Sequence, residues 1–166
     1  MKPASYLTTA ALFATLGVAA QAKEPTLDYK ALRIDGLLFY TSKASILKTY
    51  GKPTKVTEPN YECGFHAAQQ GKRYYLLHYP GLKFIGNAAE GYVLEEVDLG
   101  PRYPQRTISY RGKRLSRLTT TADFQKLFGV KVEGNEKGLF NTNADDAFRF
   151  HFVGGRLVKI DYWSPC

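Results

Sequence analysis

The chain has 166 residues, 44% of them hydrophobic, so it is too short for more than one ordinary domain or two small modules that share a core. Lysines and arginines number 23 against 15 aspartates and glutamates, which gives a formal net charge of +8 at pH 7. In the cytosol this charge would favour nucleic acid as a partner, whereas in an exported protein it favours an acidic protein surface or an anionic envelope polymer.

Residues 1–22 are predicted to be an export signal that is removed. Lys2 provides a positive start, an apolar stretch follows, and Ala20-Gln21-Ala22 matches the small-residue pattern of a cleavage site. The apolar part is far short of the roughly 20 residues that span a bilayer, and no cysteine lies near the cleavage point. We therefore expect a periplasmic or secreted protein with no membrane span, no lipid anchor and no nucleic-acid partner.

Two cysteines, Cys63 and Cys166, remain in the mature chain. In an oxidising compartment, two is the number that forms one disulfide. The alternative is that Cys63 is buried as a small hydrophobic residue and that Cys166 is a free C-terminal thiol. The sequence favours the disulfide.

Two segments carry the start and stop signals of short helices. In the first, Thr41 or Ser42 is the candidate N-cap and Gly51 the stop; in the second, Thr120 begins a capping box with Asp123 and Gly129 is the stop. Each helix has an apolar stripe, formed by Ile46, Leu47 and Tyr50 in the first and by Phe124, Leu127 and Phe128 in the second. About nine residues are too few for a helix that is stable alone, so both must lie on something else.

Alternation and aromatic content predict β-strands after each helix. The segment 94–99, LEEVDL, is echoed by 157–162, LVKIDY. The predicted strands are 72–79, 91–99, 146–152 and 155–163, with shorter candidates at 61–67 and 138–143.

These elements predict an α+β fold of two copies, each a short helix plus about three antiparallel strands, with the helices packed on one face of a curved sheet. The first unit is expected at 23–101 and a second, shorter unit at 118–166. The alternative is a chance similarity of two amphipathic segments.

Residues 102–117 form a strongly basic run with two tyrosines. We interpret this run as a solvated connector between the two units that is available to acidic partners. A charged linker and edge strand, kept from aggregating by its charges, is the plainer interpretation.

The tandem helices, the Gly-Lys-Pro stop at 51–53 and the strand echo resemble the β-lactamase-inhibitor-protein (BLIP-like) family. A single unit is also similar to the outer-membrane assembly lipoproteins of the BamE/SmpA type. The resemblance covers most of the mature chain and implies a sheet whose open face grips a protein partner. The lipid-anchor cysteine of the BamE type is absent, and BLIP-type proteins carry a disulfide within each repeat, whereas here one pair would join the two.

Alternation along the strands predicts which side chains face away from the helices. This outward face is rich in aromatic and charged residues, as protein interfaces are, although loops or termini that cover the aromatics would be a plainer explanation. The predicted partner-binding residues are Tyr74, His78, Tyr92, Glu96, Arg149, His151, Lys159 and Trp163.

No catalytic or metal-binding constellation has a secure spacing. Cys63 and His66 are three apart, which places them on opposite faces of a strand, and Cys63 is better explained by the disulfide. His78 and His151, with Asp98 or Asp161, lack the spacing of a metal site, and there is no phosphate loop or nucleophile elbow. We predict no cofactor, no metal and no enzyme activity.

The predicted function is that of an exported, non-enzymatic module that binds a protein, as an inhibitor or immunity-type protein acting on a secreted or envelope protein. The alternative is a soluble envelope-assembly or structural component that resembles BamE-type proteins. A small hydrolase or metal-dependent enzyme is the third hypothesis, which the missing motifs disfavour.

Overall fold

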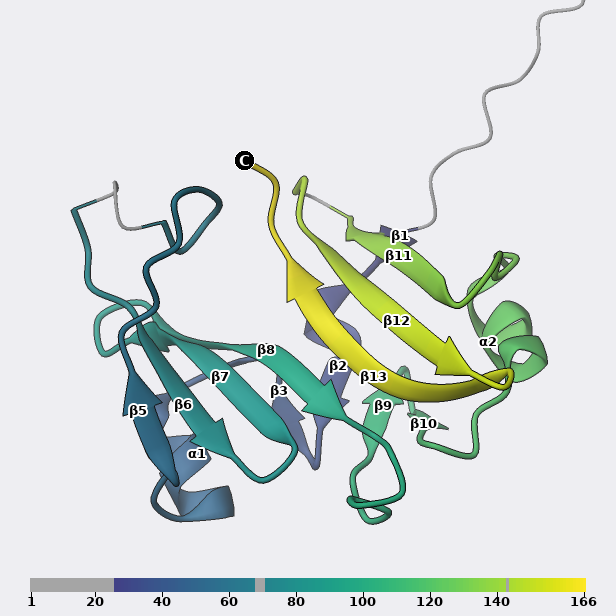
Figure 1. Ribbon diagram of the computed structural model, residues 1–166, viewed down its shortest axis with the longest axis horizontal. Coiled ribbons are helices and arrows are strands. Elements are labelled where there is room, and N and C mark those ends of the chain that lie inside the picture. The colour runs from purple at the N-terminus through teal and green to yellow at the C-terminus, as the bar shows by residue number, and fades with distance from the viewer. Residues whose placement is uncertain (1–25, 68–70, 143) are drawn as a thin grey trace, which may run out of the picture.

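The protein is mostly β in a computed structural model that describes residues 26–67, 71–142 and 144–166 (Figure 1). Strands make up 44% of the structure and helices 14%. The predicted export signal at 1–22 lies outside the described residues.

The largest element is a nine-stranded sheet with the order β1-β11-β12-β13-β8-β7-β6-β5, in which β4 also pairs with β8. Only the first pair, β1 with β11, is parallel, so the sheet is mixed. Its strands are β1 (Thr26–Leu27), β4 (Tyr40–Thr41), β5 (Lys55–Thr57), β6 (Tyr75–Tyr79), β7 (Leu82–Asn87), β8 (Gly91–Asp98), β11 (Glu136–Asn141), β12 (Ala147–Val153) and β13 (Arg156–Trp163).

A second, four-stranded sheet has the order β10-β9-β2-β3. Its strands are β2 (Leu32–Ile34), β3 (Leu37–Leu38), β9 (Ile108–Tyr110) and β10 (Lys113–Leu115). The pairing of β2 with β9 joins the start of the described chain to the basic run at 102–117, which therefore contains two strands.

The two α-helices begin and end where the capping signals predict. Helix α1 (Lys43–Tyr50) has Ser42 as its N-cap and Gly51 at its end, and α2 (Thr121–Phe128) starts with the complete capping box of Thr120 and Asp123. A 3-10 helix, η1 (Tyr29–Ala31), precedes β2. Within the described ranges, no helix has the length and apolar character needed to cross a membrane.

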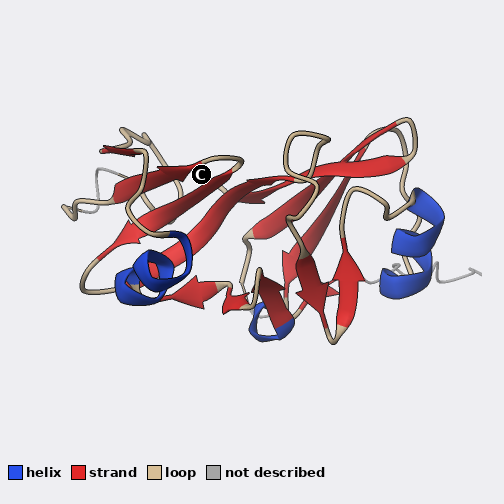
Figure 2. Ribbon diagram, turned by 90° about the horizontal axis from the view of Figure 1, so that it is seen from below, coloured by secondary structure: helices blue, strands red, loops and turns tan. Residues whose placement is uncertain are grey.

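The prediction of an α+β protein built from two helix-plus-sheet copies is wrong. Two helices of eight residues are too little to make a helical layer, and the dominant element is the single mixed sheet. Viewed from its edge, this sheet lies above a layer that contains α1, the four-stranded sheet and α2 (Figure 2). The two-copy prediction assigned no strand to the segments that form β2 and β3, and it treated 102–117, which forms β9 and β10, as a connector between the copies.

The core lies on the side of the large sheet that carries α1 and α2. Phe124 of α2 is fully buried, and its ring centroid lies 4.8 Å from that of Phe150 and 5.4 Å from that of Phe152, both in β12. Tyr50 of α1 contacts Tyr79 and Phe84 of the large sheet in the same way. Aromatic burial of this kind, rather than helix propensity, holds such short helices in place.

The predicted disulfide between Cys63 and Cys166 is confirmed, with a Cα–Cα distance of 4.9 Å across 103 residues of sequence. It joins the loop before β6 to the segment that follows β13. Disulfides of this kind are typical of proteins that fold outside the reducing cytosol.

Candidate functional site

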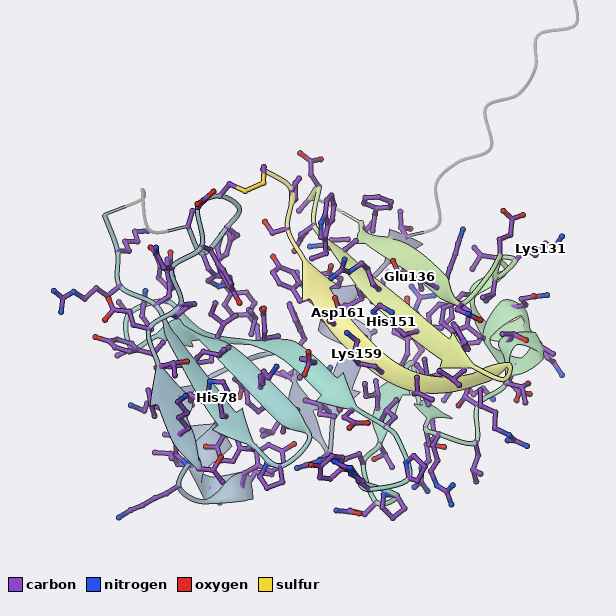
Figure 3. The ribbon with its side chains drawn as sticks, viewed as in Figure 1. His78, Lys131, Glu136, His151, Lys159 and Asp161 are labelled. Atoms are coloured by element: carbon purple, nitrogen blue, oxygen red, sulfur yellow. A yellow bond between two sulfur atoms is a disulfide. The ribbon has the colours of Figure 1, made fainter. Side chains whose placement is uncertain are left out.

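The open face of the large sheet, opposite α1 and α2, carries a hydrogen-bonded set of charged side chains that we call the Asp161 cluster. It consists of Arg149 and His151 of β12, Lys159 and Asp161 of β13, and Glu136 of β11 (Figure 3). Arg149 lies directly across from Asp161, and His151 lies across from both Lys159 and Glu136. Alternation along paired strands therefore puts all five on one face.

Asp161 is the centre of this cluster. Its carboxylate accepts hydrogen bonds from Arg149 and from a ring nitrogen of His151, and the Lys159 ammonium lies 3.1 Å from it. The other ring nitrogen of His151 lies 3.2 Å from Glu136. With only 6% of its surface exposed, Asp161 is held between three partly exposed donors.

The charge of Asp161 is maintained by its donors. Burial alone would raise the pKa of this carboxyl, but the hydrogen bonds from Arg149, His151 and Lys159 outweigh burial and hold the pKa below its usual value. The cluster therefore presents fixed charges whose positions are set by β-strand pairing, rather than mobile surface side chains.

The charged surface extends from β13 to β8 and β7. Glu96 lies across from Asp161 and pairs with Lys83 at 3.0 Å. Next to it, the carboxylate of Glu95 accepts a hydrogen bond from the Tyr61 hydroxyl at 2.9 Å, and burial raises the pKa of Glu95. Glu96, Arg149, His151 and Lys159, four of the predicted partner-binding residues, are thus brought together.

His78 lies on the same face but far from His151 (Figure 3). It belongs to β6, four strands away from β12 in the sheet order, which at about 4.8 Å per strand is roughly 19 Å. Its Nε2 is 2.9 Å from the Thr57 hydroxyl, and burial together with Lys83 and Lys55 lowers the pKa of His78. The two histidines cannot share a metal ion, and within the described part of the chain no group of three His, Cys, Asp or Glu side chains is arranged to hold one.

Trp163 ends β13 on the face of the Asp161 cluster, because it is two residues beyond Asp161 and pairs with Ala147. Its side chain is 37% exposed, and its ring lies edge-on to that of Phe140 at 6.4 Å. Trp163 is therefore a large aromatic surface beside fixed charges, as predicted from the strand pattern.

Tyr74 and Tyr92 were predicted to contact a partner, but both side chains are buried, with exposed fractions of 4% and 1%. Neither is available to a partner. Tyr74 precedes β6; its ring packs against that of His66 at 4.8 Å, and its hydroxyl donates to Glu90. Tyr92 is turned toward the core because β8 contains a β-bulge: Lys83 pairs with Glu96 but the next residue, Phe84, pairs with Leu94. Glu95 is the extra residue of this bulge. The side chains of β8 that precede it, including Tyr92, therefore point to the face opposite the one that regular alternation predicts.

A second irregularity affects β13. The register with β12 shifts between His151 and Phe152, and Leu157, which regular alternation with Lys159 would place on the outward face, is fully buried. A bulge of one residue is enough to move a side chain to the opposite face, so the face assignment holds from Lys159 to Trp163 and fails before that.

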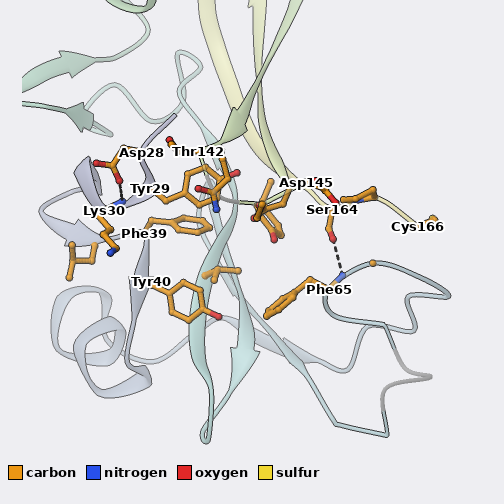
Figure 4. Close-up of a pocket in the computed structure, with 18 of the residues that line it drawn as sticks. Asp28, Tyr29, Lys30, Phe39, Tyr40, Phe65, Thr142, Asp145, Ser164 and Cys166 are labelled. Atoms are coloured by element: carbon orange, nitrogen blue, oxygen red, sulfur yellow. Dashed lines mark hydrogen bonds between the residues drawn. The ribbon is translucent and has the colours of Figure 1, made fainter. Parts of the chain in front are cut away.

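The structure also contains a large hollow that the sequence did not predict. It is an open groove of about 1370 Å³ that we call the aromatic groove, between the part of the large sheet that contains β4 and the ends of β12 and β13 (Figure 4). The pairing of β13 with β8 ends at Asp161 and Glu96, and the next residue of β13, Tyr162, lines the groove. Five rings line it: Tyr29, Phe39, Tyr40, Phe65 and Tyr162.

The walls of the aromatic groove come from distant parts of the sequence. The ring centroids of Tyr29 and Phe39 lie 4.6 Å apart on one wall, and Phe65 lies on the opposite wall (Figure 4). The Phe65 amide donates to the Ser164 hydroxyl at 2.8 Å, beside the Cys63–Cys166 bond. Because its five rings come from four separate segments, the groove has no local sequence signal, although the exposed aromatic residues Tyr40 and Phe65 are a partial one.

Three carboxylates also line the aromatic groove: Asp28, Asp145 and Asp146. Burial is the main reason that the pKa values of Tyr29, Tyr40 and Tyr162 are raised, and the charge of Asp146 contributes to all three. Asp146 therefore lies within electrostatic reach of three of the five rings.

No family model, curated protein or solved structure matches the chain at a significant level.

Proposed function

We propose that this protein is an exported binding module that recognises another secreted or envelope protein through the open face of its large sheet. The observation that carries the proposal is the Asp161 cluster, in which strand pairing fixes Arg149, His151 and Lys159 around one carboxylate next to the exposed Trp163. Fixed charges around an aromatic anchor lose little side-chain entropy on binding, which is the property of effective interfaces.

The periplasm or the extracellular space is the proposed location. The disulfide supports it, because a bond with exposed cysteines at both ends persists best in an oxidising compartment. The export signal predicted from the sequence agrees with this location.

Inhibition of the bound protein is the activity that we propose. Its support is the resemblance of the helix-stop and strand motifs to the BLIP-like family, which implies a sheet whose open face grips a protein partner. The mixed charges of the open face, with Lys83, Lys159 and Arg149 beside Glu96 and Asp161, fit a partner whose surface also carries both signs.

The experiment is capture of partners from an envelope extract of the producing cells, followed by affinity measurement with the purified partner. The test variant is Lys83→Ala/Lys159→Ala, which removes two charges from the open face. The matched control is Lys113→Ala/Lys126→Ala, which removes two charges from β10 and α2. The proposal predicts that the first variant binds the partner more weakly than wild type, and that its affinity depends less steeply on salt concentration. The control should bind like wild type. Equal loss in both variants, or in neither, contradicts it.

A further inference from the structure

The aromatic groove combines two features that point to the same kind of ligand. Its rings offer π faces, and its carboxylates give negative charge in a protein whose net charge is +8. A cation is attracted to the face of an aromatic ring, most strongly where water is excluded, and carboxylates beside the rings add to this attraction.

The lining of the groove contains buried polar atoms without partners among the described residues. Tyr29 is only 9% exposed, and its hydroxyl oxygen has no hydrogen-bond partner among the described residues. The same holds for Oδ1 of Asp146, another lining residue. Buried oxygens of this kind carry a cost that an N–H donor would relieve, since both can accept a hydrogen bond.

The distribution of charge within the groove favours a cation beside Asp145 and Asp146. Lys30 and Arg111 also line the groove, but both are exposed, and the Arg111 guanidinium lies 5.2 Å over the ring of Tyr110. Asp28 caps η1 by accepting from the Lys30 amide. The Tyr162 side chain forms a hydrogen bond with Asp146, but among the described residues no cation forms an ion pair with Asp145 or Asp146, so their charges are left to attract a ligand.

The size of the groove indicates a segment rather than a small molecule. About 1370 Å³ exceeds the roughly 300–1,000 Å³ of ordinary small-molecule pockets. Leu38, Tyr40 and Phe65, which also line the groove, are each about half exposed and give it apolar surface beside its carboxylates. An occupant with apolar side chains flanking a cationic one fits this arrangement.

We propose that the aromatic groove binds an apolar peptide segment of the partner protein that inserts a lysine or arginine side chain between the rings, beside Asp146. This proposal rests on the proposed protein-binding function and adds a second contact region to it. The open face would orient the partner through charges, and the groove would hold one cationic side chain.

The test uses three synthetic peptides: acetyl-Leu-Lys-Leu-amide, the same peptide with norleucine in place of lysine, and the same peptide with glutamate there. Binding is followed by NMR titration of the ¹⁵N-labelled protein. The lysine peptide should bind at least about fivefold more tightly than the norleucine peptide, and the glutamate peptide most weakly. The largest chemical-shift changes should occur at residues that line the groove.

Variants identify the groups responsible. Asp146→Asn keeps the shape of the side chain but removes its charge, and should abolish the preference for lysine; Tyr40→Ala, at a half-exposed position, should weaken the lysine peptide about fivefold without unfolding the protein. Glu133→Gln, an exposed acid away from the groove, is the control and should bind like wild type.

Equal affinity for the lysine and norleucine peptides, an unchanged preference in Asp146→Asn, or no saturable shift up to about 10 mM peptide would each overturn the proposal. Its failure is distinct from failure of the proposed function, because partner capture is tested with Lys83 and Lys159 on the open face. A partner that depends on those lysines but not on Asp146 leaves the proposed function standing and removes the groove from it.

Discussion

Cys63 and Cys166 are 103 residues apart in sequence, yet their Cα atoms lie 4.9 Å apart and their sulfurs are bonded. The bond holds the end of the chain against the loop that carries Phe65 and His66. Because these two segments supply one wall of the aromatic groove, the disulfide stabilises both the fold and this surface.

The first prediction concerns this bond. Replacing both cysteines with serine should lower the free energy of unfolding by about 2–5 kcal/mol, because the unfolded chain is no longer constrained across a long loop. Urea denaturation with and without a phosphine reductant measures the effect. The reductant should destabilise wild type by a similar amount and leave the double variant unchanged; labelling of the unfolded, unreduced protein should find no free thiol. Two labelled thiols per chain would contradict the bond.

The second prediction concerns α2. Phe124→Ala should destabilise the protein by about 3–5 kcal/mol, because its ring is fully buried among Phe128, Phe150 and Phe152. Thermal and urea unfolding measure the loss. Leu118→Ala is the control, since that side chain is well exposed and should shift stability by less than about 0.5 kcal/mol.

The third prediction separates two neighbours in α1. The sequence pattern put Ile46 and Leu47 on one buried stripe, but Ile46 is fully buried and Leu47 is 37% exposed. Ile46→Ala should therefore cost about 2–5 kcal/mol and Leu47→Ala much less. Similar losses in the two variants would mean that α1 is rotated relative to the sheet.

These cases show how far sequence reasoning extends. Helix ends were predictable because capping depends on local side chains, such as Thr120 and Asp123. The four-stranded sheet was not, because strands of two or three residues are too short to show alternation.

The candidate site was predicted in part. Arg149, His151, Lys159 and Trp163 share the open face as expected, because regular alternation holds along these stretches of β12 and β13. Tyr92 and Leu157 were assigned to the wrong face because a bulge adds one residue without any clear signal in composition. The aromatic groove depends on long-range contacts that only the folded chain brings together.

The fourth prediction is a pH dependence. Burial lowers the pKa of His66 from 6.5 to about 4, with the nearby Glu90 carboxylate opposing this shift. Between these two values the unfolded chain binds a proton that the folded protein excludes, so stability should rise with pH across this window. Lowering the pH from 6.5 to 4 should cost roughly 1–3 kcal/mol from this group.

The matched variant is His66→Phe, which keeps a ring against Phe65 and Tyr74. Urea denaturation at several pH values should show a flatter profile for this variant than for wild type. Both proteins retain Glu95, whose pKa burial raises, so the difference between the two profiles isolates His66. Parallel profiles would show that His66 is not the titrating group.

The last prediction tests Trp163 as the aromatic anchor of the proposed interface. Its side chain is 37% exposed on the face of the Asp161 cluster, and its ring contact among the aromatics is with Phe140. Truncation of an aromatic anchor costs about 2 kcal/mol or more of binding free energy, whereas a partly exposed ring adds little to the core. Trp163→Ala should therefore weaken partner binding about 30-fold while the thermal midpoint changes little.

Val153→Ala, at a more exposed position in β12, is the control and should change neither quantity. Calorimetric titration gives the affinity and differential scanning calorimetry gives the midpoint. Unchanged affinity removes Trp163 from the interface, and a large drop in the midpoint shows that the ring supports the sheet rather than a partner.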